Sequence, residues 1–179
     1  MAGPFPTAVA LQTPRLVLEP LQVQHAAEMA TLLSDAALYR FTGGGPLDEP
    51  TLRARYTRQV AGRSPDGRQA WRNWIVRRAS DGAALGFVQA TVSDADGEPR
   101  VAELAWTIGV AFQRHGYARE AAVALRDWLS AQGVAGLIAH IHPENTGSMG
   151  VARALGLSQT AVVRGGEVLW ASPPVTSSG

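Results

Sequence analysis

The sequence contains no cysteine among its 179 residues. This absence excludes disulfide bonds, a thiol nucleophile and metal sites built from thiolates. Without a disulfide framework nothing points to an oxidising compartment, so we expect a reducing, cytoplasmic one. The chain also has no apolar stretch near the ~20 residues that a helix needs to cross a bilayer. The opening residues MAGPFPTAVA lack the basic region and apolar run of a signal peptide, and we expect no membrane partner.

The sequence also lacks a large excess of either positive or negative charge. Sixteen basic residues face fifteen acidic ones, for a formal net charge of +1. No strong overall field therefore draws the protein to nucleic acid. A local cluster of arginines between Arg53 and Arg68 leaves contact with tRNA open as an alternative.

The residues that are present suit one globular domain. Hydrophobic residues make up 46% and charged residues 17% of the chain, which is enough to fill one core. Pro4 and Pro6 stand among small side chains without periodicity, so residues 1–12 are predicted to form a loose arm, and residues 172–179 a second flexible tail. No repeat or linker divides the remainder, and the predicted domain is 13–171.

Helices and strands alternate in the hydrophobic pattern. Alternating apolar and polar residues predict strands over 15–19, 71–78, 85–92, 102–110, 137–141, 162–164 and 167–170. Apolar residues at helical spacing predict helices over 25–33, 48–60, 120–132 and 146–155. Turn and cap residues separate these elements, including Asp81-Gly82, Gly133, Asn145, Gly156 and Gly165-Gly166. The predicted class is α+β (or α/β), with helices around a mixed sheet.

The segment QRHGYA, residues 113–118, joins a predicted strand to a predicted helix. A turn of small residues at a helix N-terminus gathers several unpaired backbone N–H groups in one concavity. Those donors and the helix dipole suit a pyrophosphate group. Gly116 and Ala118 fit this interpretation because bulkier side chains would keep phosphate oxygens from the amides.

The pattern Gln113-x-x-Gly116-x-Ala118 resembles the acetyl-CoA motif Q/R-x-x-G-x-G/A of the GNAT acetyltransferase superfamily. The run ELAWTIGVAFQRHGYAREA is similar to that family's fourth strand, phosphate turn and following helix. HPENTGSMGVARALGL is similar to the exit of its fifth strand and its fourth helix. Near the N-terminus, LQTPRLVLEPL, HAAEMATLLSD and LYRFTGGGP resemble the branch of ribosomal-protein N-terminal acetyltransferases, the Rim type. The resemblance covers about Thr13 to Trp170.

The resemblance implies a mixed, mainly antiparallel sheet of six to seven strands flanked by about four helices. The fourth and fifth strands of this sheet are expected to splay apart, with the pantetheine arm of acetyl-CoA in the gap. In this chain the resemblance assigns the pairing backbone groups to Trp106, Ile108 and Val110, whose side chains we expect in the core. Acetyl-CoA is the implied co-substrate, and no metal is implied.

The resemblance also implies which residues bind the pyrophosphate. The backbone amides of Arg114 to Ala118 would hold it, with Arg114 or Arg119 adding charge. Arg119 fits equally well as a solvated surface residue. The expected coenzyme-binding residues of this segment are Gln113, Arg114, His115, Gly116, Tyr117, Ala118 and Arg119. Asn145 is expected to cap the next helix first and to reach the coenzyme as well.

Transfer to an amine needs a group that removes a proton and one that protonates the leaving thiolate. Glu103 is our candidate base, because the family often has glutamate on this strand; the alternative is a salt-bridged glutamate at the rim. Many family members protonate the thiolate with a tyrosine where this chain has Ala152. Ser148 is the nearest substitute and resembles the serine of the Rim-type branch, although it also fits as an ordinary helix residue.

The implied function is transfer of an acetyl group to a primary amine of a small molecule or of a peptide or protein N-terminus. The acceptor pocket is expected between the first two helices, the loop 39–46 and the closing hairpin. One alternative keeps the fold and takes the acyl group from a carrier protein or from aminoacyl-tRNA. Another is a non-catalytic CoA-binding module, favoured by the missing tyrosine. The sequence leaves a homodimer open.

Overall fold

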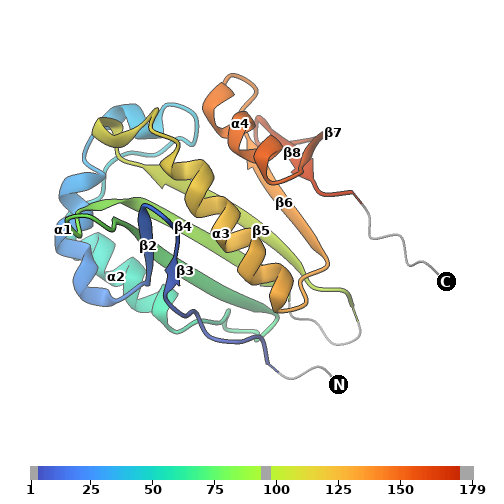
Figure 1. Ribbon diagram of the computed structural model, residues 1–179, viewed down its shortest axis with the longest axis horizontal. Coiled ribbons are helices and arrows are strands. Elements are labelled where there is room, and N and C mark those ends of the chain that lie inside the picture. The colour runs from blue at the N-terminus through green and yellow to red at the C-terminus, as the bar shows by residue number, and fades with distance from the viewer. Residues whose placement is uncertain (1–3, 94–97, 174–179) are drawn as a thin grey trace.

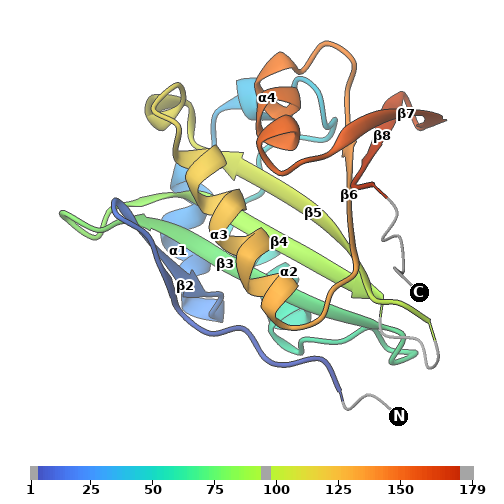
Figure 2. The same cartoon turned by 45° about the vertical axis from the view of Figure 1, so that its right-hand side comes forward.

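The computed structural model describes residues 4–93 and 98–173. A single mixed sheet runs through the molecule, with helices on both of its faces (Figures 1 and 2). The strands are β1 (Leu11–Gln12), β2 (Leu16–Pro20), β3 (Gln69–Arg78), β4 (Ala84–Ser93), β5 (Val101–Ile108), β6 (Gly136–Ile141), β7 (Ser158–Arg164) and β8 (Glu167–Ala171). The helices are α1 (Ala26–Leu32), α2 (Glu49–Val60), α3 (Tyr117–Ala131) and α4 (Thr146–Ala154), with short 3-10 segments η1 (Val23–His25), η2 (Ala36–Tyr39) and η3 (Val110–Phe112).

The order of the strands confirms the predicted mixed, mainly antiparallel sheet. Across the sheet the order is β1-β2-β3-β4-β5-β6-β8-β7. The pair β5–β6 is parallel, and the other neighbouring strands are antiparallel. Eight strands replace the expected six to seven, because the two-residue β1 has too few residues to show an alternating pattern.

The splay lies between β5 and β6, as the resemblance implied for the family's fourth and fifth strands. Their pairing begins at Val101 and Gly136 and ends where Glu103 faces Ile138. Beyond that point β5 continues to Ile108 and β6 to Ile141 without a further pair. The two strands visibly diverge in Figure 2. Backbone groups of β5 are therefore left without a strand partner on one side.

Each face of the sheet is closed by its own pair of helices. Side chains of a strand alternate between faces, so Ala102, Leu104 and Ile108 pack with α3 and α4 in the larger core cluster. Helices α1 and α2 close the other face, where Met29 and Tyr56 pack against Ile75. Over β5 and β6 that second face stays more open, and Glu103 lies there with its side chain half exposed.

The N-terminal arm is not loose, and the prediction for residues 1–12 is wrong for the segment 5–12. Phe5 is buried, with 3% exposure, and its ring meets Trp128 edge to face at 5.8 Å. The buried guanidinium of Arg72 donates to the carbonyl of Phe5 at 2.7 Å, and Leu11 pairs with Leu18 of β2. Residues 1–3 lie outside the described residues.

The C-terminal boundary also differs slightly from the prediction. The amide of Ser172 donates to the carbonyl of Leu137 at 2.9 Å, and its hydroxyl accepts from the Leu137 amide at 3.0 Å. The sheet contacts therefore continue one residue past the predicted domain end at 171. The predicted tail over 174–179 lies outside the described residues.

Two local predictions around the motif need correction. The strand predicted to reach Val110 ends at Ile108, because the chain turns into the 3-10 segment η3, where the Phe112 amide donates to the Gly109 carbonyl at 2.8 Å. The helix predicted from Glu120 begins three residues earlier, at Tyr117. By contrast, the predicted cap is confirmed: Asn145 Oδ1 accepts from the Ser148 amide at 3.1 Å.

Candidate acetyl-CoA and amine site

The segment between η3 and α3 forms a tight turn with unusual backbone angles. Arg114 has a φ of 65° and Gly116, the N-cap of α3, has a φ of 79°. For Arg114 this left-handed conformation costs about 1 kcal/mol, whereas glycine adopts it freely. A strained non-glycine residue at such a turn indicates that the surrounding structure holds the turn in place.

The turn presents a run of free backbone donors. Within the described residues no acceptor is recorded for the N–H groups of Arg114 to Arg119, and the first pairing of this stretch is from Glu120 to the Gly116 carbonyl at 3.0 Å. Successive unpaired N–H groups at a helix N-terminus, together with the helix dipole, form a site for an anion. The geometry therefore fits the pyrophosphate of acetyl-CoA.

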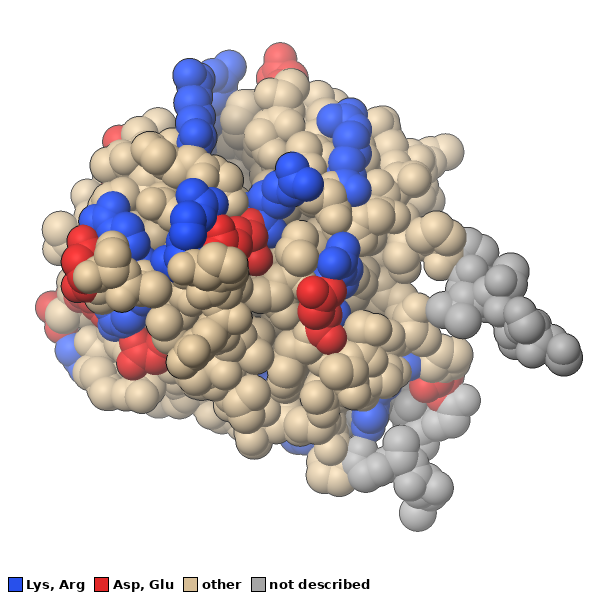
Figure 3. Space-filling model, viewed as in Figure 1, with Lys and Arg blue, Asp and Glu red and all other residues tan. Residues whose placement is uncertain are grey.

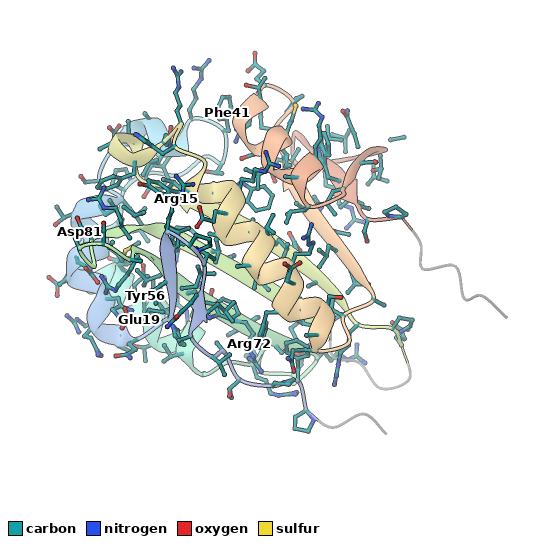
Figure 4. The ribbon with its side chains drawn as sticks, viewed as in Figure 1. Arg15, Glu19, Phe41, Tyr56, Arg72 and Asp81 are labelled. Carbon is teal, nitrogen blue, oxygen red and sulfur yellow. The ribbon has the colours of Figure 1, made fainter. Side chains whose placement is uncertain are left out.

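A clamp from the start of β2 holds this turn, and sequence reasoning missed it. The Arg15 guanidinium donates to the His115 carbonyl at 2.9 Å and to Glu120 Oε2 at 2.7 Å, while Thr13 Oγ1 donates to Glu120 Oε1 at 2.6 Å. Arg15 also lies over the ring of Tyr117, 4.7 Å from its centre, beside the first turn of α3 (Figure 4). In the sequence Arg15 was only the first residue of a predicted strand.

The electrostatics of the clamp keep Glu120 ionised. Partial burial raises the pKa of the Glu120 carboxyl, but hydrogen bonds from Thr13 and Arg15, with the charge of Arg15, outweigh burial and lower it overall. A carboxylate at this first turn also interacts favourably with the helix dipole. The clamp thus stays formed at neutral pH.

The side chains of the motif have different surroundings. Gln113 Nε2 donates to the Ile108 carbonyl at 2.9 Å, which ties the turn to the end of β5. The His115 ring stacks on Tyr117 with centroids 5.6 Å apart. Arg114 and Arg119 are exposed, as is much of the turn. Basic side chains gather around the start of α3, with some acidic ones between them (Figure 3).

Hydrogen bonding at the ends of β5 shows which backbone groups face the gap. The Arg100 carbonyl accepts from the Ala135 amide at 2.8 Å on the β6 side, whereas the Gly109 amide donates to Leu85 at 2.8 Å on the β4 side. The backbone N–H and C=O groups of successive residues point to alternate sides of a strand. Those of Trp106 and Ile108 therefore point toward β6, beyond the last paired residues of β5 and β6. Val110, assigned to the same set, lies outside the strand in η3, and the expectation that its side chain is in the core is wrong, because the turn leaves Val110 exposed.

Both predicted catalytic side chains make contacts across this gap, on opposite faces of the sheet. Glu103 Oε1 lies 2.9 Å from Nδ1 of His140 on β6. On the α3 face, Trp106 Nε1 donates to the hydroxyl of Ser148 on α4 at 3.3 Å. The gap is thus flanked by a carboxylate–imidazole pair on one side and a hydroxyl on the other. His140 was not singled out from the sequence.

The first turn of α4 positions Ser148 through its cap. Asn145 holds the Ser148 amide, so the hydroxyl starts from a fixed backbone. Ala152, one turn further, is fully buried in the core cluster. This position therefore offers no polar atom to the gap, and Ser148 is the hydroxyl that α4 brings to Trp106.

The predicted acceptor loop reaches the exit of β6. The ring of Phe41, which follows η2, lies 5.4 Å from that of His142 at a tilt of 33° (Figure 4). This contact brings the loop 39–46 to the segment between β6 and α4. In residues 4–93 and 98–173 no group of three or more His, Asp or Glu side chains could hold a metal ion. No helix in that part of the chain has the length and apolar character to cross a membrane.

The splayed sheet and the turn before α3 are typical of acetyltransferases of the GNAT type, and a comparison of the sequence with known families agrees. Residues 15–158 match the family described as Acetyltransferase (GNAT) domain. The match covers more than half of the chain, so the protein belongs to the GNAT acetyltransferase family, whose fold implies acetyl-CoA as co-substrate. No curated protein matches the sequence.

Solved structures share this fold at low sequence identity. An acetyltransferase from Agrobacterium tumefaciens is 22% identical, with a TM-score of 0.70 over 97% of this chain and 99% of its own. RimL, a ribosomal L7/L12 alpha-N-protein acetyltransferase in complex with coenzyme A, is 14% identical, with a TM-score of 0.74 over 93% and 98%. An acetyltransferase from Salmonella typhimurium that modifies the N-terminal serine of L7/L12 is 14% identical, with a TM-score of 0.72 over 91% and 98%.

Proposed function

We propose that the protein transfers the acetyl group of acetyl-CoA directly to a primary amine of a small molecule or of a peptide or protein N-terminus. The observation that carries this proposal is the gap between β5 and β6, with the Glu103–His140 pair on one face and Ser148 on the other. The names of the RimL-like structural neighbours favour N-terminal amines as one acceptor class.

The reaction forms a nitrogen–carbon bond and breaks the carbon–sulfur bond of the thioester that acetyl-CoA supplies. One proton must leave the amine nitrogen, and one must reach the leaving sulfur. Glu103 accepts the first proton directly or through the ring of His140, whose Nδ1 lies 2.9 Å from Glu103 Oε1. Ser148 lies on the opposite face, where its hydroxyl donates toward the sulfur.

The remaining residues bind and orient. Amides of Arg114 to Ala118 hold the pyrophosphate, with Arg114 and Arg119 adding positive charge nearby. Backbone groups of Trp106 and Ile108 pair with the pantetheine arm in the gap. Asn145 fixes the turn that carries Ser148. Binding and chemistry are thus assigned to different residues, which makes them separable by experiment.

The test measures acetyl transfer from acetyl-CoA to a panel of primary amines and N-terminal peptides by mass spectrometry. Glu103→Gln should lower turnover on the order of 10²-fold while coenzyme affinity changes little, since a base contributes about that factor. Ser148→Ala should also slow turnover at unchanged affinity. Glu49→Gln, which alters an exposed carboxylate on α2, is the matched control.

Three outcomes would contradict the proposal. Coenzyme binding without transfer to any amine would indicate a non-catalytic CoA-binding module. Transfer only from a carrier protein or from aminoacyl-tRNA would show that acetyl-CoA is not the acyl donor. Wild-type turnover in both Glu103→Gln and Ser148→Ala would remove these residues from the reaction.

A further inference from the structure

A small pocket opens between α2 and the sheet, on the same face as Glu103, and the roles assigned above do not use it. Its volume is about 50 Å³, which is enough for a carboxylate-sized group or a few water molecules. Leu33, Leu52 and Phe87 contribute to its apolar wall. Its polar lining is Arg55, Tyr56, Gln59, Asn73 and Gln89. Tyr56 projects from α2 in Figure 4.

These polar side chains have no protein partner. In the described part of the chain no hydrogen bond or ion pair is recorded for the Arg55 guanidinium, the three side-chain amides or the Tyr56 hydroxyl. Tyr56 is only 5% exposed as a residue, but its hydroxyl is not a fully buried atom, so a molecule in the pocket can reach it. Polar groups that converge, unpaired, on an otherwise apolar pocket are typical of a ligand site.

The lining selects the charge of the ligand. It contains one cation and no carboxylate, and each amide offers two N–H donors. Burial raises the pKa of Tyr56 to about 12, against a smaller opposing effect of the Arg55 charge. The Tyr56 hydroxyl therefore remains a protonated donor at neutral pH. The pocket presents donors and positive charge, which is the complement of an anion.

We infer that this pocket receives a carboxylate carried by the acceptor amine. Arg55 is an exposed residue of the lining, and its planar guanidinium can donate two parallel hydrogen bonds to a carboxylate. A carboxylate rather than a phosphate is expected because the cavity is small. The inference rests on the proposed function and names its substrate class as amines with a distal carboxylate, either free amino acids or peptides with an acidic residue near the N-terminus.

The sheet register connects this pocket to the reacting groups. Gln89 of β4 lies opposite Ala105 of β5, and Thr91 lies opposite Glu103. Side chains of all four residues share the face that carries α2. Diagonal neighbours across an antiparallel pair lie roughly 7–8 Å apart, so Gln89 and Glu103 are within reach of one small molecule. A carboxylate held at Arg55 thus directs the amine end along β4 and β5 toward the gap.

The experiment compares matched pairs of acceptors with full-length protein and acetyl-CoA. Each pair is an ω-amino carboxylate of defined length and its carboxamide, or a peptide with Asp and one with Asn at the second position. The carboxylate should be favoured in kcat/KM on the order of 10-fold to 100-fold, as for a charged hydrogen bond. Arg55→Gln should abolish the preference while transfer to the carboxamide continues. Because the sequence contains no lysine, no lysine side chain of the enzyme competes with the added acceptors.

Arg58→Gln is the matched control, since Arg58 is exposed on the same helix and does not line the pocket. Preference for the carboxylate in either the small-molecule or the peptide series, lost in Arg55→Gln only, supports the inference. Equal rates for acid and amide, a preference that survives Arg55→Gln, or a stronger preference for phosphate-bearing amines would each overturn it. In those three cases acetyl transfer still occurs and the proposed function stands. No transfer to any amine would instead overturn the proposed function.

Discussion

At the scale of single residues, the turn before α3, which we propose holds the pyrophosphate, depends on Gly116, a glycine that no other residue replaces freely. Gly116 has a φ of 79°, and a Cβ there would lie 3.4 Å from a guanidinium nitrogen of Arg15. Gly116→Ala should destabilise the fold by about 1 kcal/mol through backbone strain. It should also raise the dissociation constant for coenzyme A on the order of 10-fold. A loss of about 1.4 kcal/mol of binding free energy at the displaced amides corresponds to that factor.

Titration calorimetry with coenzyme A measures this effect. Gly150→Ala is the control, because Gly150 lies in α4 with open space around its Cβ position. Alanine in a helix interior should stabilise by roughly 0.5–1 kcal/mol and leave affinity unchanged. Equal affinity in both variants would show that the turn does not bind the pyrophosphate.

The same scale shows what the sequence could reveal about the site. The motif from Gln113 to Ala118 identified the turn because its residues are contiguous, and backbone donors there follow from local geometry. The partners were not visible, because Arg15 is 100 residues from His115 and His140 is 37 residues from Glu103. Such contacts are created by the sheet order, which one sequence does not specify.

At the scale of elements, two helices begin with comparable side-chain caps, and only α4 carries a residue that we assign to the chemistry, Ser148. Asn145 Oδ1 accepts from the Ser148 amide at 3.1 Å, and Asp48 Oδ1 accepts from the Thr51 amide at 2.9 Å. Loss of either cap should cost about 1 kcal/mol. Asn145→Ala should in addition lower turnover, because the backbone that carries Ser148 loses its anchor. Asp48→Ala, at the start of α2, should leave turnover of an acceptor without a carboxylate unchanged.

Thermal unfolding and steady-state kinetics on the two variants separate these effects. A similar fall of turnover in both variants would mean that general destabilisation, rather than the position of Ser148, limits the reaction. Unchanged turnover in Asn145→Ala would remove the cap from the site. Restored turnover in Asn145→Asp would support the positioning role, because aspartate caps as well as asparagine.

Periodicity predicted the helices and the central strands well, and it failed where short or irregular segments begin. The alternation that runs through β5 continues by chance to Val110, although the chain has already turned at Gly109. Tyr117 begins α3 in the structure, because Gly116 ends the turn with a left-handed conformation that the apolar pattern does not encode. Strand β1 contains two residues, too few for a period.

At the scale of the whole molecule, the N-terminal arm closes the core beside α3. Phe5 is buried against Trp128, Arg72 holds the Phe5 carbonyl, and Trp74 Nε1 donates to the Val9 carbonyl at 2.7 Å. The sequence could not show this packing, because one aromatic residue between two prolines has no periodicity and its partners lie more than sixty residues away.

Phe5→Ala should therefore lower the free energy of unfolding by about 3 kcal/mol, as for a buried aromatic side chain. A loose arm would lose less than about 0.5 kcal/mol. Val9→Ala is the control, because Val9 is 49% exposed and its backbone carbonyl, which accepts from Trp74 Nε1, is kept in the variant. Urea unfolding measures the free energy of unfolding of both variants, which can be compared if their m-values agree. The arm leads through β1 to Thr13 and Arg15, which hold the turn before α3. Phe5→Ala should therefore also weaken coenzyme A binding. Full stability with unchanged affinity would mean that the arm does not support the site.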